Sequence, residues 1–297
     1  MKGCTSAYVP EYSQKRLENA ADGEIILVHS SGMYLRFGAE VFLLCDKSWG
    51  ALPIGILLED FQQSVRLLRP KAGQRVCRQG EALNFPGGSV HLCPMPVLAQ
   101  GGGVPRKEML LQAAEELAAL QKTSGLSLLV LPMVLGRACP PVLQENPYFS
   151  RAYPEFEKLL AALAAEDAAA AEHHTRQLLG LGVGLTPSAD DVFLGMLYMF
   201  KRLLPDPSCA VSRFQDTVFG VAEHRSNQIS AAYLKAVAQG APFERMERVY
   251  RGFCGEEPLK IEYLTQIGSN SGSEMLLGML LAWDVCQGQP SKEEETR

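Results

Sequence analysis

The sequence predicts an α+β protein in which a small β-barrel or sandwich-like domain is followed by an all-helical domain. Between Glu24 and about Gln100 the apolar residues form short runs of strand length that are separated by turn residues. From Pro154 onward the apolar residues recur with the spacing of amphipathic helices. A chain of 297 residues has room for about two domains. We place the boundary at a triple glycine, which gives a β-rich domain over 1–103 and a helical domain over 104–297.

Six segments of the N-terminal domain have the length and composition of strands. They are bounded by turn residues, such as Ser30-Ser31-Gly32 and Pro86-Gly87-Gly88. A short helix is expected over 60–68. The expected strands are 24–29, 33–37, 40–45, 54–58, 74–77 and 89–92.

The helical domain is expected to begin with a helix over 108–122, which follows Pro105 and carries apolar residues every three or four positions. Residues 125–153 contain four prolines and are expected to be irregular. Pro154 should then precede a nearly continuous series of helices. Their expected ranges are 155–164, 167–179, 188–204, 209–223, 226–239, 242–253, 258–267 and 271–287.

Composition excludes several classes of protein. With 47% apolar and 21% charged residues, the chain is globular rather than disordered. The 28 basic and 33 acidic residues give a net charge of −5, and no basic run exceeds two residues, so no nucleic-acid surface is indicated. The longest apolar stretches fall well short of the roughly 20 residues that a membrane-spanning helix needs. Because no apolar signal region follows the N-terminus, we expect a cytoplasmic protein.

The cysteines and histidines show no pattern of a metal site. The eight cysteines lie singly along the chain, without a Cys-x-x-Cys pair, and are expected to be small buried side chains. The histidine spacings of zinc sites and the Gly-x-Ser-x-Gly elbow of serine hydrolases are also missing from the sequence. We therefore expect no metal-ligand set and no bound cofactor, with Mg²⁺ as the one candidate if the ligand is a phosphate.

The most distinctive segment is the loop 180–191, Gly-Leu-Gly-Val-Gly-Leu-Thr-Pro-Ser-Ala-Asp-Asp. Its three alternating glycines permit backbone angles that other residues resist, and they let a ligand or another segment approach closely. Thr186 and Ser188 add hydroxyl groups. Asp190 and Asp191 then place two adjacent carboxylates just before an apolar helix.

A second copy of this pattern lies at 268–274, Gly-Ser-Asn-Ser-Gly-Ser-Glu. When Ser188 is aligned with Ser271, Asp191 falls on Glu274, and both following helices carry a glycine, at 195 and at 278. A glycine inside a helix costs about 1 kcal/mol relative to alanine, and close helix packing compensates for that cost. We therefore expect the two helices to pack together, with their first residues less than about 20 Å apart, on the scale of a helix diameter.

Two interpretations of these loops are open. In each loop the serine and the acid three residues later fit the capping box, in which the hydroxyl and the carboxylate bind free N–H groups at a helix start. Capping alone gives no role to the alternating glycines, Thr186, Asp190 or Asn270. The second interpretation combines capping with a ligand site.

The chemistry of the loops indicates which ligand would fit. Free N–H groups at two helix starts favour a phosphate or a carboxylate, whereas the carboxylates favour an amide or a cation. A small ligand with both an anionic group and an amide would use both features. Ser226 and Asn227 lie between the loops and offer further polar groups, with Ser226 as a helix N-cap being the alternative. The expected catalytic residues are Asp190 and Asp191, and the expected substrate-binding residues are Gly182, Gly184, Thr186, Ser188, Ser226, Asn227, Asn270, Ser271, Gly272 and Glu274.

The segment 181–191 resembles the signature of the AllH family, Gly-Leu-Gly-x-Gly-Leu-Thr-Pro-Ser-Gly-Asp-Asp. The resemblance extends over most of the chain, from a β-rich N-terminal part to a second glycine and hydroxyl loop. It implies a subunit of an oxamate carbamoyltransferase in anaerobic allantoin and purine breakdown. That assembly interconverts oxamate plus carbamoyl phosphate with oxalurate plus phosphate. The resemblance thus implies other subunits as partners and a small anionic amide or carbamoyl compound as substrate.

The chain departs from the family pattern at three places. Ala189 stands where the family usually has glycine, and Ser226-Asn227 replaces a common pair of threonines. The second loop has Ser269 in place of a histidine and ends on Glu274 in place of an aspartate. Two alternatives therefore stay open: a non-catalytic scaffold or ligand-binding subunit whose glycine loops admit the backbone of a partner, and a small-molecule amide or ureide hydrolase.

Overall fold

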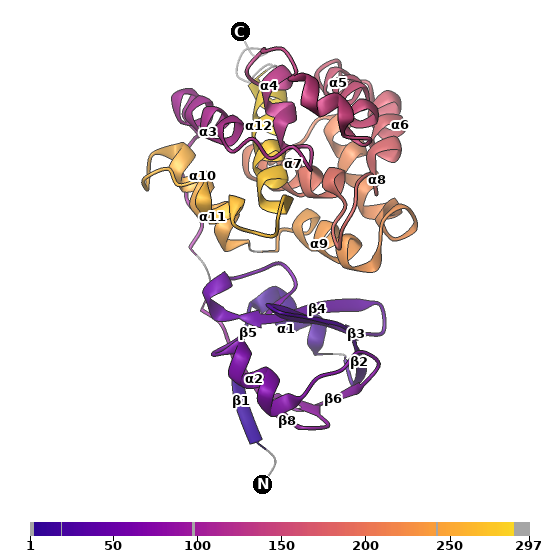
Figure 1. Cartoon of the computed structure of the whole chain (residues 1–297), viewed down its shortest axis with the longest axis vertical. Helices are drawn as coiled ribbons and strands as arrows, with labels where there is room; N and C mark the ends of the chain where they lie inside the picture. Colours follow the sequence, from indigo (N-terminus) through magenta and orange to yellow (C-terminus); the bar gives the residue numbers. More distant parts are fainter. Residues whose placement is uncertain (1–2, 19, 97–98, 242, 288–297) are drawn as a thin grey trace. The chain divides into compact units, whose positions relative to one another are not determined.

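The computed structural model describes residues 3–18, 20–96, 99–241 and 243–287, and it confirms the α+β class. The chain divides into two compact units, one formed by 1–100 with 241–245 and the other by 101–240 with 246–297. The strands belong to the first unit, and most helices belong to the second (Figure 1).

The described strands of the first unit close into a barrel in the order β1-β5-β4-β3-β2-β6-β7-β8. Strand β1 completes the closure, because it pairs in parallel with β8 and antiparallel with β5. The pairs β2–β3, β3–β4, β6–β7 and β7–β8 are antiparallel neighbours along the chain. The bounds are β1 (Gly3–Val9), β2 (Asp22–His29), β3 (Gly32–Phe37), β4 (Glu40–Asp46), β5 (Gly55–Leu58), β6 (Arg75–Gln79), β7 (Ala82–Phe85) and β8 (Gly88–Pro94).

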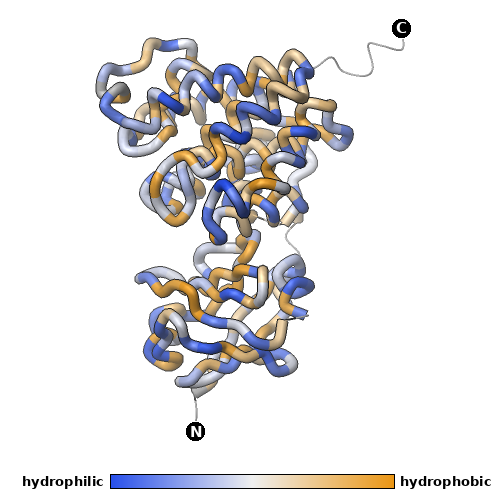
Figure 2. Tube along the Cα trace, turned by 90° about the vertical axis from the view of Figure 1, so that its right-hand side faces the viewer, coloured by the Kyte–Doolittle hydropathy of each residue, from blue (hydrophilic) through white to orange (hydrophobic). Residues whose placement is uncertain are grey.

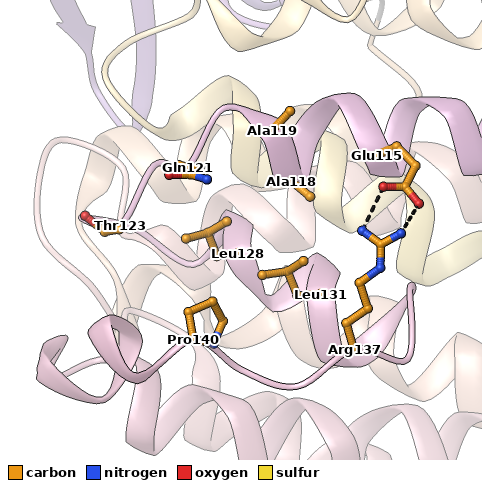
Figure 3. A pocket seen from close by; sticks show the side chains of 9 residues that line it. All are labelled: Glu115, Ala118, Ala119, Gln121, Thr123, Leu128, Leu131, Arg137 and Pro140. Atoms are coloured by element: carbon orange, nitrogen blue, oxygen red, sulfur yellow. Dashed lines mark hydrogen bonds and ion pairs between the residues drawn. The ribbon is translucent and has the colours of Figure 1, made fainter.

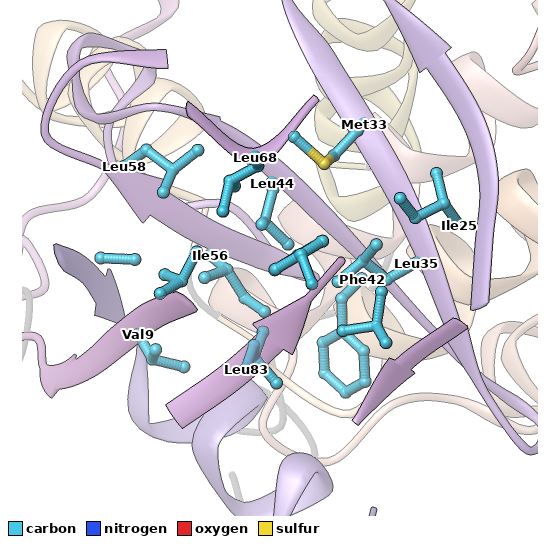
Figure 4. Packing of buried hydrophobic residues seen from close by; sticks show 14 of the residues in the cluster. Val9, Ile25, Met33, Leu35, Phe42, Leu44, Ile56, Leu58, Leu68 and Leu83 are labelled. Atoms are coloured by element: carbon cyan, nitrogen blue, oxygen red, sulfur yellow. The ribbon is translucent and has the colours of Figure 1, made fainter. Parts of the chain in front are cut away.

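The barrel is filled by apolar side chains from alternate strand positions, as its pleated geometry requires. Figure 4 shows this core, in which Ile25, Leu35, Leu44 and Leu83 come from four different strands and are fully buried. These runs of alternating apolar residues are the local signal that predicted the strands, and all six expected strands are confirmed with small changes at their ends.

Four elements of the barrel unit were not predicted: β1, β7, the helix α1 (Glu11–Leu17) and the 3₁₀ helix η1 (Lys47–Trp49). Strand β1 begins with the polar run Cys4-Thr5-Ser6, which carries no strand pattern of its own. Its pairing with β5 and β8 fixes it instead, and those partners lie far away in the sequence. The expected short helix is confirmed as α2 (Phe61–Leu68), whose N-cap Asp60 accepts a hydrogen bond from the Gln63 N–H at 2.9 Å.

The second unit is built from helices, as predicted (Figure 1). Helix α11 is shorter than expected, and the expected start of α10 at 242 lies outside the described residues. The α-helices are α3 (Lys107–Ala119), α4 (Val130–Met133), α5 (Phe149–Ala164), α6 (Ala168–Leu178), α7 (Ser188–Leu203), α8 (Cys209–Arg225), α9 (Gln228–Ala238), α10 (Glu244–Cys254), α11 (Glu262–Thr265) and α12 (Ser271–Gln287). Short 3₁₀ helices, η2 (Ser127–Leu129) and η3 (Pro141–Glu145), interrupt the segment that was expected to be irregular.

The expectation that Pro154 precedes its helix is wrong, because α5 begins at Phe149 and contains Pro154. A proline inside a helix removes one backbone hydrogen bond. The additional turn compensates by burying Phe149 and Ala152, and the ring of Phe149 stacks on that of Tyr153 at a centroid distance of 5.8 Å. Tertiary packing therefore extends this helix beyond the point at which the local sequence would begin it.

Helices α7 and α12 form the centre of the second unit. Both are buried over most of their length. Along the trace of the chain as a whole, hydrophobic and hydrophilic residues alternate (Figure 2). A helix that is apolar all round must be enclosed by other elements. Within the described ranges, no helix has the length and apolar character needed to cross a membrane.

The triple glycine at 101–103 is tied to the second unit by its backbone. The Gly101 N–H donates to Glu247 Oε1 at 2.5 Å, and the N–H groups of Gly102 and Gly103 donate to Glu256 Oε1 at 3.1 and 2.7 Å. A Cβ on Gly103 would lie 2.8 Å from the Cβ of Cys254, so this close approach of the chain requires glycine.

Candidate functional site

The two loop–helix copies meet because α7 and α12 cross at their glycines. A Cβ built on Gly195 of α7 would lie 1.9 Å from the carbonyl oxygen of Met275 in α12. A Cβ built on Gly278 of α12 would lie 1.9 Å from the carbonyl oxygen of Val192 in α7. The contacts are reciprocal, so the two copies are related by an approximate twofold axis through the crossing. The expected close packing of these helices is confirmed.

The starts of α7 and α12 lie side by side. The hydroxyl oxygens of Thr186 and Ser271 are 3.2 Å apart, which confirms the expected proximity of the helix starts. Ser271 lies near Asp191 and Ser188 lies near Glu274, and each serine hydroxyl opposes the rise in the pKa of the neighbouring carboxyl. The internal repeat in the sequence therefore places the serine of each copy beside the acid of the other copy.

Asp191 and Glu274 form a buried acidic pair beneath the loops, with exposed fractions of 0% and 1%. Oδ2 of Asp191 accepts a hydrogen bond from the Thr186 hydroxyl at 2.8 Å, whereas Oδ1 is buried without a hydrogen-bond partner in the described part of the chain. Burial raises the pKa of Asp191 well above its usual range, and the nearby Glu274 carboxyl raises it further. Burial also raises the pKa of Glu274, against the opposing effect of the hydrogen bond that it accepts from the Leu126 N–H at 2.9 Å.

Asp190 points to a different set of partners and connects the glycine loop to α9. Its Oδ1 accepts from the Gly180 N–H at 2.8 Å, and its Oδ2 accepts from the Ser230 hydroxyl at 2.6 Å and from the Ser226 hydroxyl. Burial raises the pKa of Asp190, while these three hydrogen bonds favour its charged form. Both carboxylate oxygens are thus engaged by the protein itself.

The caps that the sequence suggested for α7 and α9 are not formed. The N-cap of α7 is Pro187, which has no side-chain cap, and Ser188 is the first helical residue. Ser226 is not the N-cap of α9 either, because Asn227 holds that position and accepts from the N–H groups of Ile229 and Ser230 at 3.0 Å each. For α7 the capping-box interpretation fails because Ser188 is already helical and Asp191 accepts from the Thr186 hydroxyl rather than from a backbone N–H of the helix start.

The glycine loop needs its glycines for two different reasons. Gly180 and Gly182 have φ angles of 79° and 126°, and a Cβ at either position would come within 2.5 Å of backbone atoms. Gly184 has a φ of 111° but open space around it, so only its backbone angle requires glycine. The Asn227 side chain donates to the carbonyl oxygen of Leu185 at 2.9 Å and thereby ties the tip of the loop to α9.

The second loop is equally constrained. A Cβ on Gly272 would lie 1.7 Å from the carbonyl oxygen of Leu264, so α12 starts in direct backbone contact with α11. The side chain of Asn270 hydrogen bonds to the hydroxyl of Ser124 at about 3 Å. Ser271 is directed toward Thr186 of the first loop, as described above.

Lys122 and Ser124 contribute to this region but were missed from the sequence. The predicted helix over 108–122 ends at Ala119, and the segment after it, Gln121–Leu126, runs beside the second loop. Lys122 Nζ donates to the carbonyl oxygens of Thr265 and Ser269 at 3.0 and 2.8 Å. No local pattern marks these residues, because only the tertiary fold brings the end of α3 next to the start of α12.

The predicted site residues therefore gather in one region around the starts of α7, α9 and α12, in two layers. The lower layer is buried and fixes the loops. The upper layer is at least partly exposed and presents hydroxyl, amide and backbone groups. The buried residues are Ser188, Asp190, Asp191, Gly272 and Glu274, and the partly or fully exposed ones are Gly182, Gly184, Thr186, Ser226, Asn227, Asn270 and Ser271.

The residues of this region do not form a set of metal ligands. Among the described residues, no group of three or more His, Cys, Asp or Glu side chains is arranged to hold a metal ion. Asp190 and Asp191 are adjacent in sequence but engage different partners, so they do not present their carboxylates together. Any role of Mg²⁺ stays a prediction.

Two cavities of the helical unit lie apart from the predicted site residues. One, of about 360 Å³, has an apolar floor of Leu128, Leu131 and Pro140, with the ion pair of Glu115 and Arg137 at one side (Figure 3). The other, of about 500 Å³, is lined by residues that include Gly101–Gly103, Arg202 and Tyr250. Within the described part of the chain, neither cavity is lined by a residue that the sequence predicted for the site.

Comparison with known proteins identifies the segment that carries both loops. No solved structure matches the chain. Residues 178–283 match the sequence model of a family described as "Oxamate carbamoyltransferase subunit AllH". The matched range begins just before Gly180 and ends within α12, so it contains both copies of the loop–helix unit. Residues 178–283 of this chain are therefore similar to the AllH family, whose description names a subunit of an oxamate carbamoyltransferase.

Proposed function

We propose that this chain binds the small substrates of an oxamate carbamoyltransferase on the polar surface at the starts of α7, α9 and α12. The reaction joins oxamate and carbamoyl phosphate into oxalurate and releases phosphate, or runs in reverse. The observation that carries the proposal is the pairing of two helix starts, whose loops present hydroxyl and amide groups above a buried acidic pair. Helix starts favour anions, and both substrates are anions.

The transfer requires positioning and charge stabilisation more than an activated nucleophile. The amide nitrogen of oxamate attacks the carbamoyl carbon, the bond from that carbon to the phosphate oxygen breaks, and one proton leaves the nitrogen. Oriented donors stabilise the negative charge that develops on the carbonyl oxygen and on the departing phosphate. Thr186, Asn227, Asn270 and Ser271 are the partly exposed side chains that supply such donors.

We assign to Asp191 the role of accepting this proton. Thr186 donates to Asp191 Oδ2 at 2.8 Å and is itself partly exposed, so a proton from the substrate has a route through this hydroxyl. Burial raises the pKa of Asp191, so this carboxylate binds a proton more readily than an exposed one does. Asp190 receives a different role in the proposal, because its oxygens are occupied by Gly180, Ser226 and Ser230: it positions the glycine loop.

A scaffold subunit without catalysis is the second candidate function. The observation that favours it is the exposure of Val183 and Leu185 at the tip of the glycine loop, 63% and 43% respectively. An exposed apolar loop tip on a subunit of a larger enzyme is a natural contact for a partner. In this case the loops would receive a partner's backbone rather than a small ligand.

Binding to the isolated chain distinguishes the two functions. We expect carbamoyl phosphate or oxamate to stabilise the chain alone, by about 2.7 kcal/mol at a concentration 100 times the dissociation constant. Thr186→Val, which removes the hydroxyl but keeps the shape, should abolish that stabilisation and the transfer activity measured with the partner subunits. Thr217→Val is the matched control, because Thr217 is a buried threonine of α8 whose hydroxyl bonds only within its helix.

Three outcomes would contradict the proposal in different ways. Stabilisation by partner subunits but by none of the substrates favours the scaffold. Hydrolysis of carbamoyl phosphate or oxalurate by the isolated chain, without transfer, indicates a hydrolase. Full transfer activity in Thr186→Val removes the glycine loop from the mechanism.

A further inference from the structure

We propose that Lys122, which lies outside the segment matched to the AllH family, binds an oxyanion of the substrate at the start of α12. The inference rests on the proposed function, since it assigns the main positive charge of the same site. The oxyanion is either the phosphate of carbamoyl phosphate or the carboxylate of oxamate. Lys122 would supply the full positive charge that the hydroxyl and amide donors of the two loops lack.

The ammonium group of Lys122 is held in place by neutral partners. Its Nζ donates to the carbonyl oxygens of Thr265 and Ser269, at 3.0 and 2.8 Å, and these residues lead into the start of α12. A lysine ammonium carries three N–H donors, so one is left for a ligand. Lys122 takes part in none of the ion pairs formed by the described residues, so its charge is not neutralised by direct contact with a carboxylate.

The backbone around Lys122 is fixed, which makes the position of its charge reproducible. Gln121 adopts a left-handed φ of 47°, which turns the chain sharply after α3. The Asn146 side chain donates to the carbonyl oxygens of Thr123 and Gly125 at 3.2 and 3.0 Å. Gln121 and Thr123 line the cavity of Figure 3, whereas Lys122 contacts the second loop. Successive side chains of this segment therefore point alternately to the cavity and to the second loop, and Lys122 points to the second loop.

The surrounding charges suit a bound anion. Glu274 is close enough to raise the pKa of Lys122, but burial has the larger effect and lowers it. A half-buried cation that has lost hydration without gaining a carboxylate partner is stabilised by an incoming oxyanion. Carbamoyl phosphate and oxamate both carry such an oxyanion.

The test compares Lys122→Gln and Lys122→Arg with the unchanged chain. Lys158→Gln is the control, because it removes the same charge from an exposed position on α5. Binding of inorganic phosphate and of oxamate to the full-length chain is measured by titration calorimetry. We expect Lys122→Gln to weaken binding of one of these anions by at least about tenfold, as for a charge-assisted hydrogen bond, and Lys122→Arg to restore much of it. Loss of phosphate binding assigns Lys122 to carbamoyl phosphate, and loss of oxamate binding assigns it to oxamate.

Steady-state kinetics with the partner subunits separate binding from structure. Lys122→Gln should raise the KM of the affected substrate at least about tenfold and leave the KM of the other within about twofold. A variant that melts at a lower temperature but binds both anions as before would show that Lys122 only clamps the second loop, and would overturn the inference. If no transfer is found in the unchanged complex although phosphate binding depends on Lys122, the proposed function fails and the anion site stands.

Discussion

The crossing of α7 and α12 makes a strong quantitative prediction for Gly278→Ala. The added Cβ would lie 1.9 Å from the carbonyl oxygen of Val192, whereas carbon atoms at such positions stay at least 3.0 Å from other heavy atoms. The helices must therefore separate by about an ångström along a buried contact, and such overpacking costs up to about 3 kcal/mol. Alanine returns up to about 1 kcal/mol through its higher helix propensity, so the expected net loss is about 2 kcal/mol.

A matched control exists in α8. Gly220 is also inside a helix, but a Cβ there meets no heavy atom within 4 Å. Gly220→Ala should therefore stabilise the chain by up to about 1 kcal/mol, because only the propensity term remains. The two substitutions are chemically identical, so the difference between them of about 3 kcal/mol measures the contact at the crossing.

A double mutant tests whether the two glycines belong to one contact. Gly195→Ala and Gly278→Ala each force the same separation of α7 from α12. Once the helices have moved apart for one alanine, the second costs less, so the double mutant should lose less stability than the sum of the two, by about 0.5–3 kcal/mol.

Urea-induced unfolding, followed by the helical circular dichroism signal, gives the required free energies. The reasoning would be refuted if Gly278→Ala were within about 0.5 kcal/mol of the unchanged chain, the range of a harmless surface change. If the losses of unfolding free energy in the double mutant were additive, the two glycines would belong to independent contacts instead.

Two further predictions concern the buried carboxyls. Asp190→Asn should lower the free energy of unfolding by about 1–3 kcal/mol, because the amide NH2 group would then face a group that donates a hydrogen bond to the carboxylate, either the Gly180 N–H or the Ser230 hydroxyl. Thermal unfolding should detect this loss without an assay of transfer. Glu274→Gln should change the pH dependence of stability. Because burial raises the pKa of Glu274, the folded chain retains a proton that the unfolded chain releases above about pH 4.3. The free energy of unfolding of the unchanged chain should therefore fall, relative to that of the variant, as pH rises above this value. Parallel pH profiles of the two chains, from urea titrations, would contradict this sign.

Much of the fold is predictable from local patterns because its elements follow periodic rules. The alternating strands of the barrel and the amphipathic helices are read from apolar spacing alone. The missing elements have other causes: β1 depends on pairing with distant strands, and α5 begins before Pro154 because Phe149 packs well. In both cases tertiary contacts outweigh the local preference of the chain.

The residues of the candidate site were predictable from the internal repeat, although the capping interpretation of that repeat failed. The repeat of serine, acid and helix glycine revealed which segments meet, and Gly195 and Gly278 indicated how closely. The partner of each polar side chain was not predictable, because these partners depend on how the loop folds back: Asp191 accepts from Thr186, and Asp190 accepts from Ser226 and Ser230. Lys122 was missed because it lies at the end of a predicted helix, where a lone lysine has no distinguishing neighbour.

The segment 178–283, which matches the family model, coincides with the crossing of α7 and α12. It contains both glycine loops, both helix glycines and the buried acids of both copies. The two copies bury Asp191 and Glu274 near each other, so the burial of each acid depends on the packing of α7 against α12. The matched segment therefore corresponds to the crossing of α7 and α12 rather than to a set of ligand contacts. Residues that determine which ligand binds can therefore lie outside the matched segment. We expect Lys122 to be such a residue.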